Sequence, residues 1–283
     1  MTNPTPKLIP SEEEALDAWA RQVRANRDQA EAYRQGTESA DFYAPVAGGF
    51  SADPRRTDEP LLNVLLDMVG PAETWLDIGA GGGRYTLPIA LRAKAAIAVD
   101  PSPGMLGVMR ESMRQHGVDN VSIVEGRWPA VGPLDADVSF ISHVGYDIED
   151  IGPFLDAMER SARKLCVAVL LAKSPAAVAE PFWPVVHGVA RSPLPALPEF
   201  VALQLARGRL CEVSLFERTP TAYPDRAAAE RFLRQQLFIP AGGEADRRLQ
   251  TALDAVPVGT DGALTLGSAA VPVGLVSWHP GNS

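Results

Sequence analysis

Residues 75–83 carry an acid and a set of glycines whose spacing could bind a nucleotide-like molecule. The segment reads WLDIGAGGG, so an apolar run containing Asp77 leads into four glycines within five residues. A helical pattern follows over residues 84–93. This order is typical of a buried strand, a tight turn and a helix whose free N–H groups face a ligand. Glycine suits the turn because it adopts a positive φ and lets a ligand approach the main chain. The segment therefore predicts a cofactor site rather than a plain turn.

A second acid, Asp100, narrows the choice of cofactor. It closes the apolar run 95–100, and Ser102 follows as an expected N-cap for the next helix. An acid about 20 residues beyond a glycine loop is suited to accept hydrogen bonds from both ribose hydroxyls of a nucleoside. Arg84 stands where a dinucleotide fingerprint has its third glycine, so the sequence disfavours a nicotinamide dehydrogenase. An adenosyl cofactor is the better match.

The pattern Asp-x-Gly-x-Gly-x-Gly, with an acid at the end of the second strand, resembles the class I S-adenosylmethionine-dependent methyltransferases of the small-molecule type. The resemblance covers residues 54–173, more weakly outside the glycine loop. It implies that Asp77 and the loop hold the methionine amino and carboxylate groups and that Asp100 holds the ribose. The cofactor-binding residues that it implies are Asp77, Gly79, Ala80, Gly81, Gly83, Asp100, Pro101, Met105, Gly126, Arg127, Trp128, Ser142 and His143.

The end of the third strand departs from the pattern of this family. Members often have an acid there that contacts the adenine amino group, and this chain has Arg127 instead. Trp128 follows, and its indole could compensate by covering the face of the purine. A packing role for Trp128 at the edge of the sheet is the equally weighted alternative.

The order of elements predicts an α/β fold with a doubly wound, mostly parallel seven-stranded sheet, the Rossmann-like methyltransferase fold. We expect an N-terminal helical cap over residues 1–53, and a methyltransferase domain over 54–283 in which the proline-rich segment 173–198 is an irregular active-site cover after strand five. Pro272 and Gly274 place the last strand at a sheet edge or mark its start. The expected strands are 75–78, 95–100, 121–128, 136–143, 165–171, 211–218 and 271–278. Ligands of such sheets bind at the carboxyl ends of the strands.

The resemblance implies an in-line transfer of a methyl group from the sulfonium of the cofactor to a nucleophile. His143 closes the fourth strand and is the leading candidate for a general base, because an imidazole accepts protons near neutral pH. Its alternative role is a hydrogen bond without proton transfer. The expected acceptor-binding residues are Tyr43, Tyr146, Trp183 and His187. Tyr43 and the proline-rich segment with Trp183 and His187 are expected to form a hydrophobic cover, and Tyr146 to line the pocket.

Composition limits the partners of the chain. A net charge of −9 and a pI near 5.0 argue against a broad phosphate-binding surface, so bulk nucleic acid is excluded as the expected partner. No Cys/His cluster has metal spacing, and the two cysteines, Cys166 and Cys211, lie in apolar runs typical of buried thiols. Residues 1–10 do not read as a signal peptide and no apolar stretch is long enough for a membrane span, so we expect a cytoplasmic protein.

Several alternatives stay open at the level of sequence. The cofactor is expected to be S-adenosyl-L-methionine and the acceptor a small molecule, which the resemblance and the acidic charge favour together. A non-catalytic adenosyl-binding or scaffold protein, or a methyltransferase acting on protein or RNA, would carry the same loop. The identity of the acceptor, the atom that is methylated and the oligomeric state are not readable from the residues.

Overall fold

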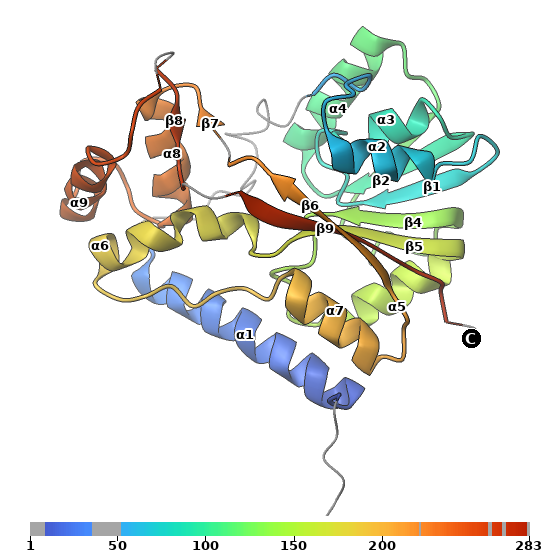
Figure 1. The fold of residues 1–283 in the computed structure, drawn as a ribbon, viewed down its shortest axis with the longest axis horizontal. Helices are drawn as coiled ribbons and strands as arrows, with labels where there is room; N and C mark the ends of the chain where they lie inside the picture. The colour runs from blue at the N-terminus through green and yellow to red at the C-terminus, as the bar shows by residue number, and fades with distance from the viewer. Residues whose placement is uncertain (1–8, 36–51, 221, 260–261, 268–269, 282–283) are drawn as a thin grey trace, which may run out of the picture.

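A computed structural model describes residues 9–35, 52–220, 222–259, 262–267 and 270–281 of the protein. Its centre is a seven-stranded sheet with the order β3-β2-β1-β4-β5-β9-β6 (Figure 1). The strands of this sheet are β1 (Thr74–Ile78), β2 (Ala95–Asp100), β3 (Val121–Glu125), β4 (Ala136–Ser142), β5 (Ala162–Leu171), β6 (Glu212–Arg218) and β9 (Val271–Trp278). Strands β1 to β5 pair in parallel, whereas β9 runs antiparallel to β5 and to β6. The order confirms the predicted doubly wound sheet.

Helices cover both faces of the sheet, as Figure 1 shows. One face carries α2 (Pro60–Asp67), α3 (Thr86–Ala90) and α4 (Pro103–His116), and the other carries α1 (Glu12–Tyr33), α5 (Ile151–Ser161) and α7 (Leu197–Ala206). The remaining described elements are η2 (Pro175–Phe182), α6 (Trp183–His187), β7 (Ala222–Tyr223), α8 (Arg226–Gln236), α9 (Glu244–Leu253) and β8 (Leu264–Thr265). A sheet buried on both faces leaves its strand ends as the accessible places for ligands.

Helix α1 is stabilised by a capping box at its first turn and by an apolar face that is buried against the sheet domain. Ser11 and Glu14 make a capping box in which Ser11 N donates to Glu14 Oε2 at 2.7 Å and Glu14 N donates to Ser11 Oγ at 3.3 Å. Trp19 and Val23 are buried on one side of the helix, and Trp19 Nε1 donates to the carbonyl oxygen of Ile148 at 2.9 Å. The described part of the expected N-terminal cap therefore packs directly onto the sheet domain.

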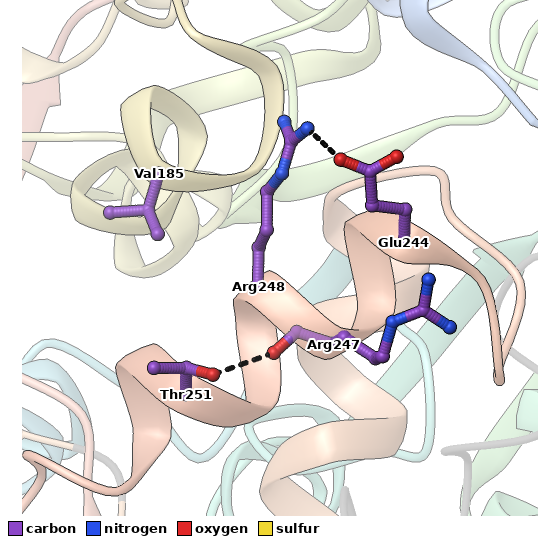
Figure 2. A pocket seen from close by; sticks show the side chains of 5 residues that line it. All are labelled: Val185, Glu244, Arg247, Arg248 and Thr251. Carbon is purple, nitrogen blue, oxygen red and sulfur yellow. Dashed lines mark hydrogen bonds and ion pairs between the residues drawn. The ribbon is translucent and has the colours of Figure 1, made fainter.

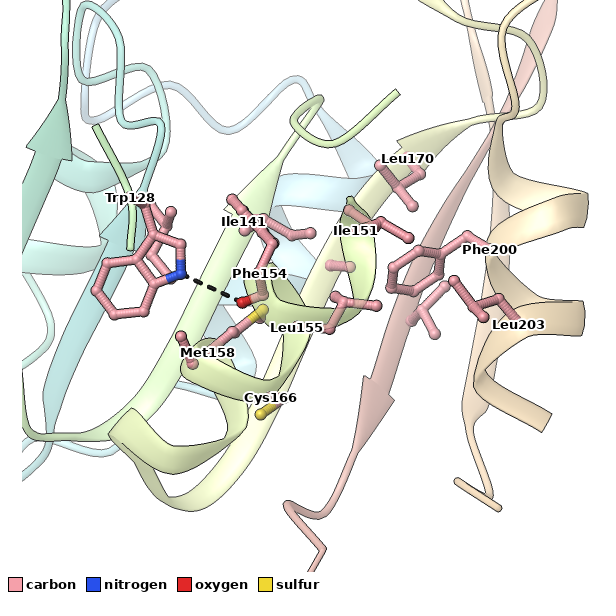
Figure 3. Packing of buried hydrophobic residues seen from close by; sticks show 14 of the residues in the cluster. Trp128, Ile141, Ile151, Phe154, Leu155, Met158, Cys166, Leu170, Phe200 and Leu203 are labelled. Carbon is pink, nitrogen blue, oxygen red and sulfur yellow. Dashed lines mark hydrogen bonds between the residues drawn. The ribbon is translucent and has the colours of Figure 1, made fainter. Parts of the chain in front are cut away.

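A cluster of buried side chains fills the layer between the sheet, α5 and α7 (Figure 3). Phe154 and Met158, one helical turn apart on α5, face the sheet, and Cys166 of β5 is fully buried in the same cluster. Phe200 of α7 packs edge to face on Trp278 of β9 with ring centroids 5.8 Å apart. Each fully buried side chain of this size contributes about 1.5–3 kcal/mol. The layer holds β4 and β5 rigidly, and with them the loops at their carboxyl ends.

The last strand lies inside the sheet and not at its edge. β9 pairs with β5 through Cys166↔Trp278 and with β6 through Arg218↔Val271. Pro272 is the second residue of the strand, so its missing N–H marks the start of β9, which is one of the two positions that the sequence predicted. Gly274 is required by packing, since a Cβ there would stand 2.6 Å from Leu197 Cδ2.

Helix α3 is shorter than the pattern over residues 84–93 predicts. It spans Thr86–Ala90 only, and Tyr85 precedes it without a side-chain cap. Pro88 has no N–H and restricts the residue before it, which limits the regular helix on both sides. The glycine loop therefore passes into a single helical turn, and the dipole of α3 contributes little to ligand binding.

A small helical unit with its own core stands beside the sheet domain, at the left of Figure 1. Its buried side chains come from η2, α6, α8, α9 and β8. Segment 173–198, expected to be irregular, contains η2 and α6, and Phe182 and Trp183 are buried. Apolar residues on α8 and α9 supply the partner surface that makes these turns regular. The sequence prediction failed here because the partner lies about 50 residues further along the chain.

A buried ion network joins α5 to the turn after α7. Glu159 is 7% exposed and accepts hydrogen bonds from Arg209 Nη2 at 2.7 Å and from Trp278 Nε1 at 3.1 Å. Arg207 Nη1 lies 3.5 Å from Glu159 Oε1 and adds a second cation. Burial acts to raise the pKa of the Glu159 carboxyl, but Arg209, Arg207 and Trp278 together lower it. The network fixes the helical layer below the sheet.

Candidate cofactor site at the carboxyl edge of the sheet

Asp100 ties the glycine loop to the start of α4. Its Oδ2 accepts a hydrogen bond from Gly81 N at 2.8 Å, and its Oδ1 accepts one from Ser102 N at 2.8 Å. Ser102 caps α4 as predicted, because its Oγ accepts a bond from Met105 N at 3.2 Å. Met105 is buried and Pro101 is exposed. The structure therefore brings the ends of β1 and β2 together at one edge, where the sequence placed the site.

The glycines of the loop serve two different purposes. A Cβ at Gly79 would overlap Val144 Cγ2, and a Cβ at Gly83 would stand 2.9 Å from Met109 Cγ, so packing explains both. Gly81 differs, because it has φ +54° and no atom lies within 4 Å of the place where its Cβ would be. An open position over a main chain with positive φ is a cradle that a side chain would fill. The space above Gly81 fits a ligand.

Asp77 carries a buried carboxyl group that is only half satisfied. It is 3% exposed, and its Oδ2 accepts a hydrogen bond from Thr86 Oγ1 at 2.6 Å. Its Oδ1 is buried without a hydrogen-bond partner among the residues that the structure describes. Burial raises the pKa of Asp77 to about 7; the bond from Thr86 opposes this rise and the charge of Asp100 adds to it. A cationic ligand group next to Oδ1 would satisfy the oxygen and stabilise its charge.

His143 lies at the end of β4 in a left-handed conformation, with φ +56°. Its N–H donates to Val169 O at 2.8 Å, which continues the ladder between β4 and β5. Tyr146 OH accepts a bond from Leu171 N at 2.8 Å and lies 3.4 Å from His143 Nδ1. The neighbouring Ser142 Oγ is buried and has no partner within the described part of the chain. Polar groups thus gather beside the glycine loop.

The electrostatics of His143 bear on its predicted role as a base. Burial lowers the pKa of the imidazole to about 3, and the positive charges of Arg218 and Arg84 act in the same direction. The ring is therefore neutral at physiological pH. The same surroundings oppose the imidazolium that a general base must form. They favour the alternative role, a hydrogen-bonding group that does not take a proton.

Comparisons with known proteins agree with this geometry. Residues 76–164 match a family model described as a methyltransferase domain, which reaches from β1 into β5. Residues 76–164 therefore form a methyltransferase domain. The match contains Asp77, the glycine loop, Asp100 and His143.

The methyltransferase domain also has curated relatives. The ribosomal RNA small subunit methyltransferase G of Neisseria meningitidis is 32% identical over 100 residues, which are 31% of this chain and 48% of that protein. The "Probable cobalt-precorrin-6B C(15)-methyltransferase (decarboxylating)" of Methanothermobacter thermautotrophicus is 28% identical over 106 residues, 36% of this chain and 55% of that protein. The chain spans about half the length of these relatives, whose own substrates differ.

Solved structures support the fold of the methyltransferase domain. The YcgJ protein of Bacillus subtilis aligns with a TM-score of 0.54 and 15% identity, over 78% of this chain and 98% of that one. A protein from Bacillus halodurans aligns with a TM-score of 0.52 and 14% identity, over 78% of this chain and 99% of that one. At such identities the likeness concerns the fold alone, and it confirms the predicted Rossmann-like architecture.

The segment after β3 lies close to the glycine loop, but its Trp128 packs into the core. Gly126 N donates to Asp100 O at 3.0 Å, which brings the ends of β2 and β3 together. Arg127 is exposed. Trp128 is only 8% exposed, and its Nε1 donates to Phe154 O at 3.3 Å within the core (Figure 3). The contacts of Trp128 therefore agree with a packing role. A contact between the exposed part of its ring and the purine stays a prediction.

The predicted acceptor-binding residues do not form one group. Tyr43 lies outside the described residues. Tyr146 is buried beside His143, whereas Trp183 belongs to the core of the helical unit and half-buried His187 packs against Trp183 with ring centroids 4.4 Å apart. Trp183 is 1% exposed and packs edge to face on Tyr33 at 5.8 Å, and His187 Nε2 is 3.0 Å from the carbonyl oxygen of Leu237. These contacts anchor α1 to the helical unit, so a role of Trp183 and His187 in acceptor binding remains an untested prediction.

One surface pocket lies on the helical unit, away from the methyltransferase loop (Figure 2). It is lined by Val185 and by side chains of α9. Arg248 forms an ion pair with Glu244, and Thr251 Oγ1 donates to Arg247 O at 3.0 Å. The side chains of Arg248 and Thr251 are thus already partnered, and the chemistry described above places no ligand beside Arg247.

Glu59 organises a group of residues that the sequence did not single out. Tyr85 OH donates to Glu59 Oε1 at 2.7 Å, while Arg84 Nη2 and Arg56 Nε lie 2.7 Å and 3.0 Å from Glu59 Oε2. Burial acts to raise the pKa of Glu59, but Tyr85 and the two arginines outweigh it and lower the pKa. Arg84, used above only to exclude a dinucleotide site, thus anchors the loop to α2. In the sequence, the only signal for Arg84 was its place in the loop, where a dinucleotide fingerprint has a glycine.

Two further observations concern metal binding and membrane-spanning helices. Among the described residues, no cluster of three or more His, Cys, Asp or Glu side chains is arranged to hold a metal ion. None of the described helices has both the length and the apolar character needed to cross a membrane.

Proposed function

We propose that the protein transfers the methyl group of S-adenosylmethionine to a small-molecule acceptor. The observation that supports this most directly is the open position above Gly81, next to the unpartnered Oδ1 of Asp77, inside the matched methyltransferase domain. The half-satisfied carboxyl is unfavourable without a ligand, because a buried oxygen with no partner costs free energy, and Gly81 leaves the main chain of the loop open to approach.

Each end of the cofactor has a matching group at this edge of the sheet. The Asp77 carboxylate would hold the methionine ammonium, and the main chain around Gly81 would face the methionine carboxylate. Each oxygen of an ionised carboxylate accepts up to two hydrogen bonds, so Asp100 would hold the loop and also accept from the ribose hydroxyls. Met105 and the segment 126–128 would border the adenine.

The sulfonium supplies a methyl group that is already activated for displacement. The task of the chain is then to orient the acceptor in line and to exclude water. His143, held neutral by burial, would donate or accept a hydrogen bond at the reaction centre without taking a proton. An acceptor that attacks as a neutral amine suits such a site better than an alcohol or a thiol, which must lose a proton first.

The net charge of −9 supports a small acceptor over a nucleic acid, since affinity for a phosphate backbone requires clustered cations. The RNA and precorrin substrates in the names of the relatives belong to those proteins. RNA, protein and non-catalytic binding are therefore the outcomes against which the proposal is tested.

Titration calorimetry with S-adenosylmethionine and with NAD tests the cofactor assignment. We expect binding of the first only, and a loss of at least tenfold, or about 1.4 kcal/mol, in the Gly81→Ala variant. Gly117→Ala is the matched control: Gly117 also has a positive φ, +65°, and open space around its Cβ position, but it ends α4. Equal affinity of the two variants would refute the cradle. A screen with methyl-labelled cofactor against small molecules, RNA and protein then identifies the acceptor class.

A further inference from the structure

A cavity of about 360 Å³ lies where β5 ends, between α1, η2 and the start of α7. Its lining includes Gln22 of α1, Lys173, Glu180, Arg191, Leu194 and Ala196. Because β5 belongs to the row of parallel strands, the cavity opens at the same edge of the sheet as the glycine loop. The proposed methyl transfer assigns no role to these side chains.

Arg191 is a cation held in place entirely by neutral groups. Its Nη1 donates to Asn26 O at 2.8 Å and to Gln29 Oε1 at 2.9 Å, and its Nη2 donates to Asn26 Oδ1 at 2.7 Å. The guanidinium also lies 4.3 Å from the ring centroid of Trp183. These contacts fix the orientation of the group before any ligand binds.

The remaining side of this guanidinium has no anion. A guanidinium has five N–H donors, and the three bonds above leave Nε–H and one Nη2–H. No carboxylate of the described chain lies within ion-pair distance of Arg191. Glu180, which lines the same cavity, pairs instead with Lys173 at 3.6 Å. Burial lowers the pKa of Arg191 to about 10, which the charge of Glu180 only partly opposes. Half-buried cations without a counter-charge are unfavourable.

We propose that this cavity binds a small monocarboxylate with an apolar body. The Nε–H and Nη2–H pair forms the fork that matches the two oxygens of a carboxylate. Leu194 and Ala196 supply an apolar wall for the rest of the molecule. Glu180 and Glu199 repel a second negative charge, so the cavity selects monoanions over dianions. The proposal does not depend on methyl transfer.

Calorimetry on the full chain tests the proposal with three probes. Benzoate is expected to bind, and benzamide, its neutral isostere, to bind at least tenfold more weakly. Sulfate is expected neither to bind nor to compete. Equal affinity for benzoate and benzamide, or displacement of benzoate by sulfate, would overturn the proposal.

Variants place the binding at Arg191. Arg191→Lys keeps the charge but loses the fork, so benzoate affinity is expected to fall at least tenfold, with a circular dichroism spectrum that shows the fold is kept. Arg24 of α1 pairs with Glu149 and does not line the cavity, so Arg24→Lys is the control and should bind benzoate normally. Undiminished binding in Arg191→Lys would place the ligand elsewhere. Should that variant unfold, the comparison of benzoate with benzamide on the unaltered chain still decides.

A second inference comes from the edge strand β6, which closes the sheet beyond β9. Leu215 is 67% exposed and Val213 is 41% exposed, so the strand presents apolar side chains to solvent. Alternate N–H and C=O groups of an edge strand are unpaired, and proteins normally protect such edges with charges, prolines or a bulge. Figure 1 shows β6 at the front of the sheet, beside β9.

The charges of β6 are complementary to those of a second copy of itself. In an antiparallel pair centred on Leu215, Glu212 of each strand stands opposite Arg218 of the other, on one face of the sheet. Both side chains are exposed and have no ion-pair partner within the described residues. We infer that two chains pair through β6 into a dimer with a continuous sheet, which would cover Leu215 and Val213.

Sedimentation equilibrium tests this pairing against the monomer mass of 30.2 kDa. We expect a dimer for the unaltered chain, a monomer for Glu212→Arg and for Arg218→Glu, and a dimer again when both changes are combined, because the double variant restores opposite charges. Arg110→Glu, on the exposed side of α4, is the control and should remain dimeric. A monomer at every concentration for the unaltered chain, or single variants that stay dimeric, would overturn the inference.

Discussion

Replacing Asp77 by asparagine should stabilise the ligand-free protein at neutral and alkaline pH. The buried carboxyl has its pKa raised from 3.8 to about 7, because burial disfavours its charged form. A group whose pKa is raised on folding adds stability below its unfolded pKa, and this contribution is lost as the pH rises through the folded pKa. The unaltered protein should thus lose stability between about pH 4 and pH 7 relative to a variant that does not titrate.

The size of the effect follows from the difference between the two pKa values. One unit corresponds to about 1.36 kcal/mol, so the ionised Asp77 costs up to about 4 kcal/mol above pH 7. Asparagine keeps an oxygen for the bond from Thr86 Oγ1 and carries no charge. We therefore expect Asp77→Asn to raise the free energy of unfolding at pH 8 by about 2–4 kcal/mol and to leave it nearly unchanged at pH 4.

Urea unfolding followed by circular dichroism at pH 4, 6 and 8 measures this difference. Glu125→Gln is the matched control, since Glu125 also ends a parallel strand but is exposed. The same substitution that stabilises the ligand-free protein should weaken cofactor binding. Asp77→Asn should bind S-adenosylmethionine at least tenfold more weakly, because the ammonium loses its charged partner. A variant that is no more stable than the unaltered protein at pH 8 would refute the electrostatic account of this site.

Four shorter predictions follow from contacts described above. Gly79→Ala should lower the free energy of unfolding by more than about 2 kcal/mol in urea titrations, because its methyl group would overlap Val144 at a positive φ. The imidazole of His143 should show no titration above about pH 5 in NMR spectra, and an inflection near pH 6.5 would contradict its burial. Glu159→Gln should cost about 3 kcal/mol at pH 7, and this cost should shrink as the pH falls through the lowered pKa of the native carboxyl, because the group then becomes protonated as well. Cys166 and Cys211, whose thiol pKa values are raised by burial, should resist iodoacetamide in the native protein at pH 7 and react in urea, as mass spectrometry would show.

The sheet edge and its acids were predictable because parallel strands put their carboxyl ends at one place. Asp77 and Asp100 each end or nearly end an apolar run, and this local pattern was enough to bring them together. The reasons for Gly79 and Gly83 were not readable in the same way. Both are set by side chains that arrive from other elements, such as Val144, about 65 residues away.

The failures have a common physical cause, which is partners distant in the chain. The core of the helical unit combines Trp183 with residues of α8 and α9, so the periodicity of residues 173–198 alone could not reveal η2 and α6. The position of β9 between β5 and β6 depends on antiparallel pairing, which leaves no crossover helix as a signal. Arg84 and Glu59 likewise meet from two separate elements.

The place of β9 has a consequence for how the chain folds during translation. Of the strands in the main sheet, β9 is synthesised last, yet it occupies the gap between β5 and β6. Until it emerges from the ribosome, β6 has no neighbour in the sheet and β5 ends the growing row. The nascent chain would therefore present two open strand borders to chaperones, and its final zipping step would be the insertion of residues 271–278.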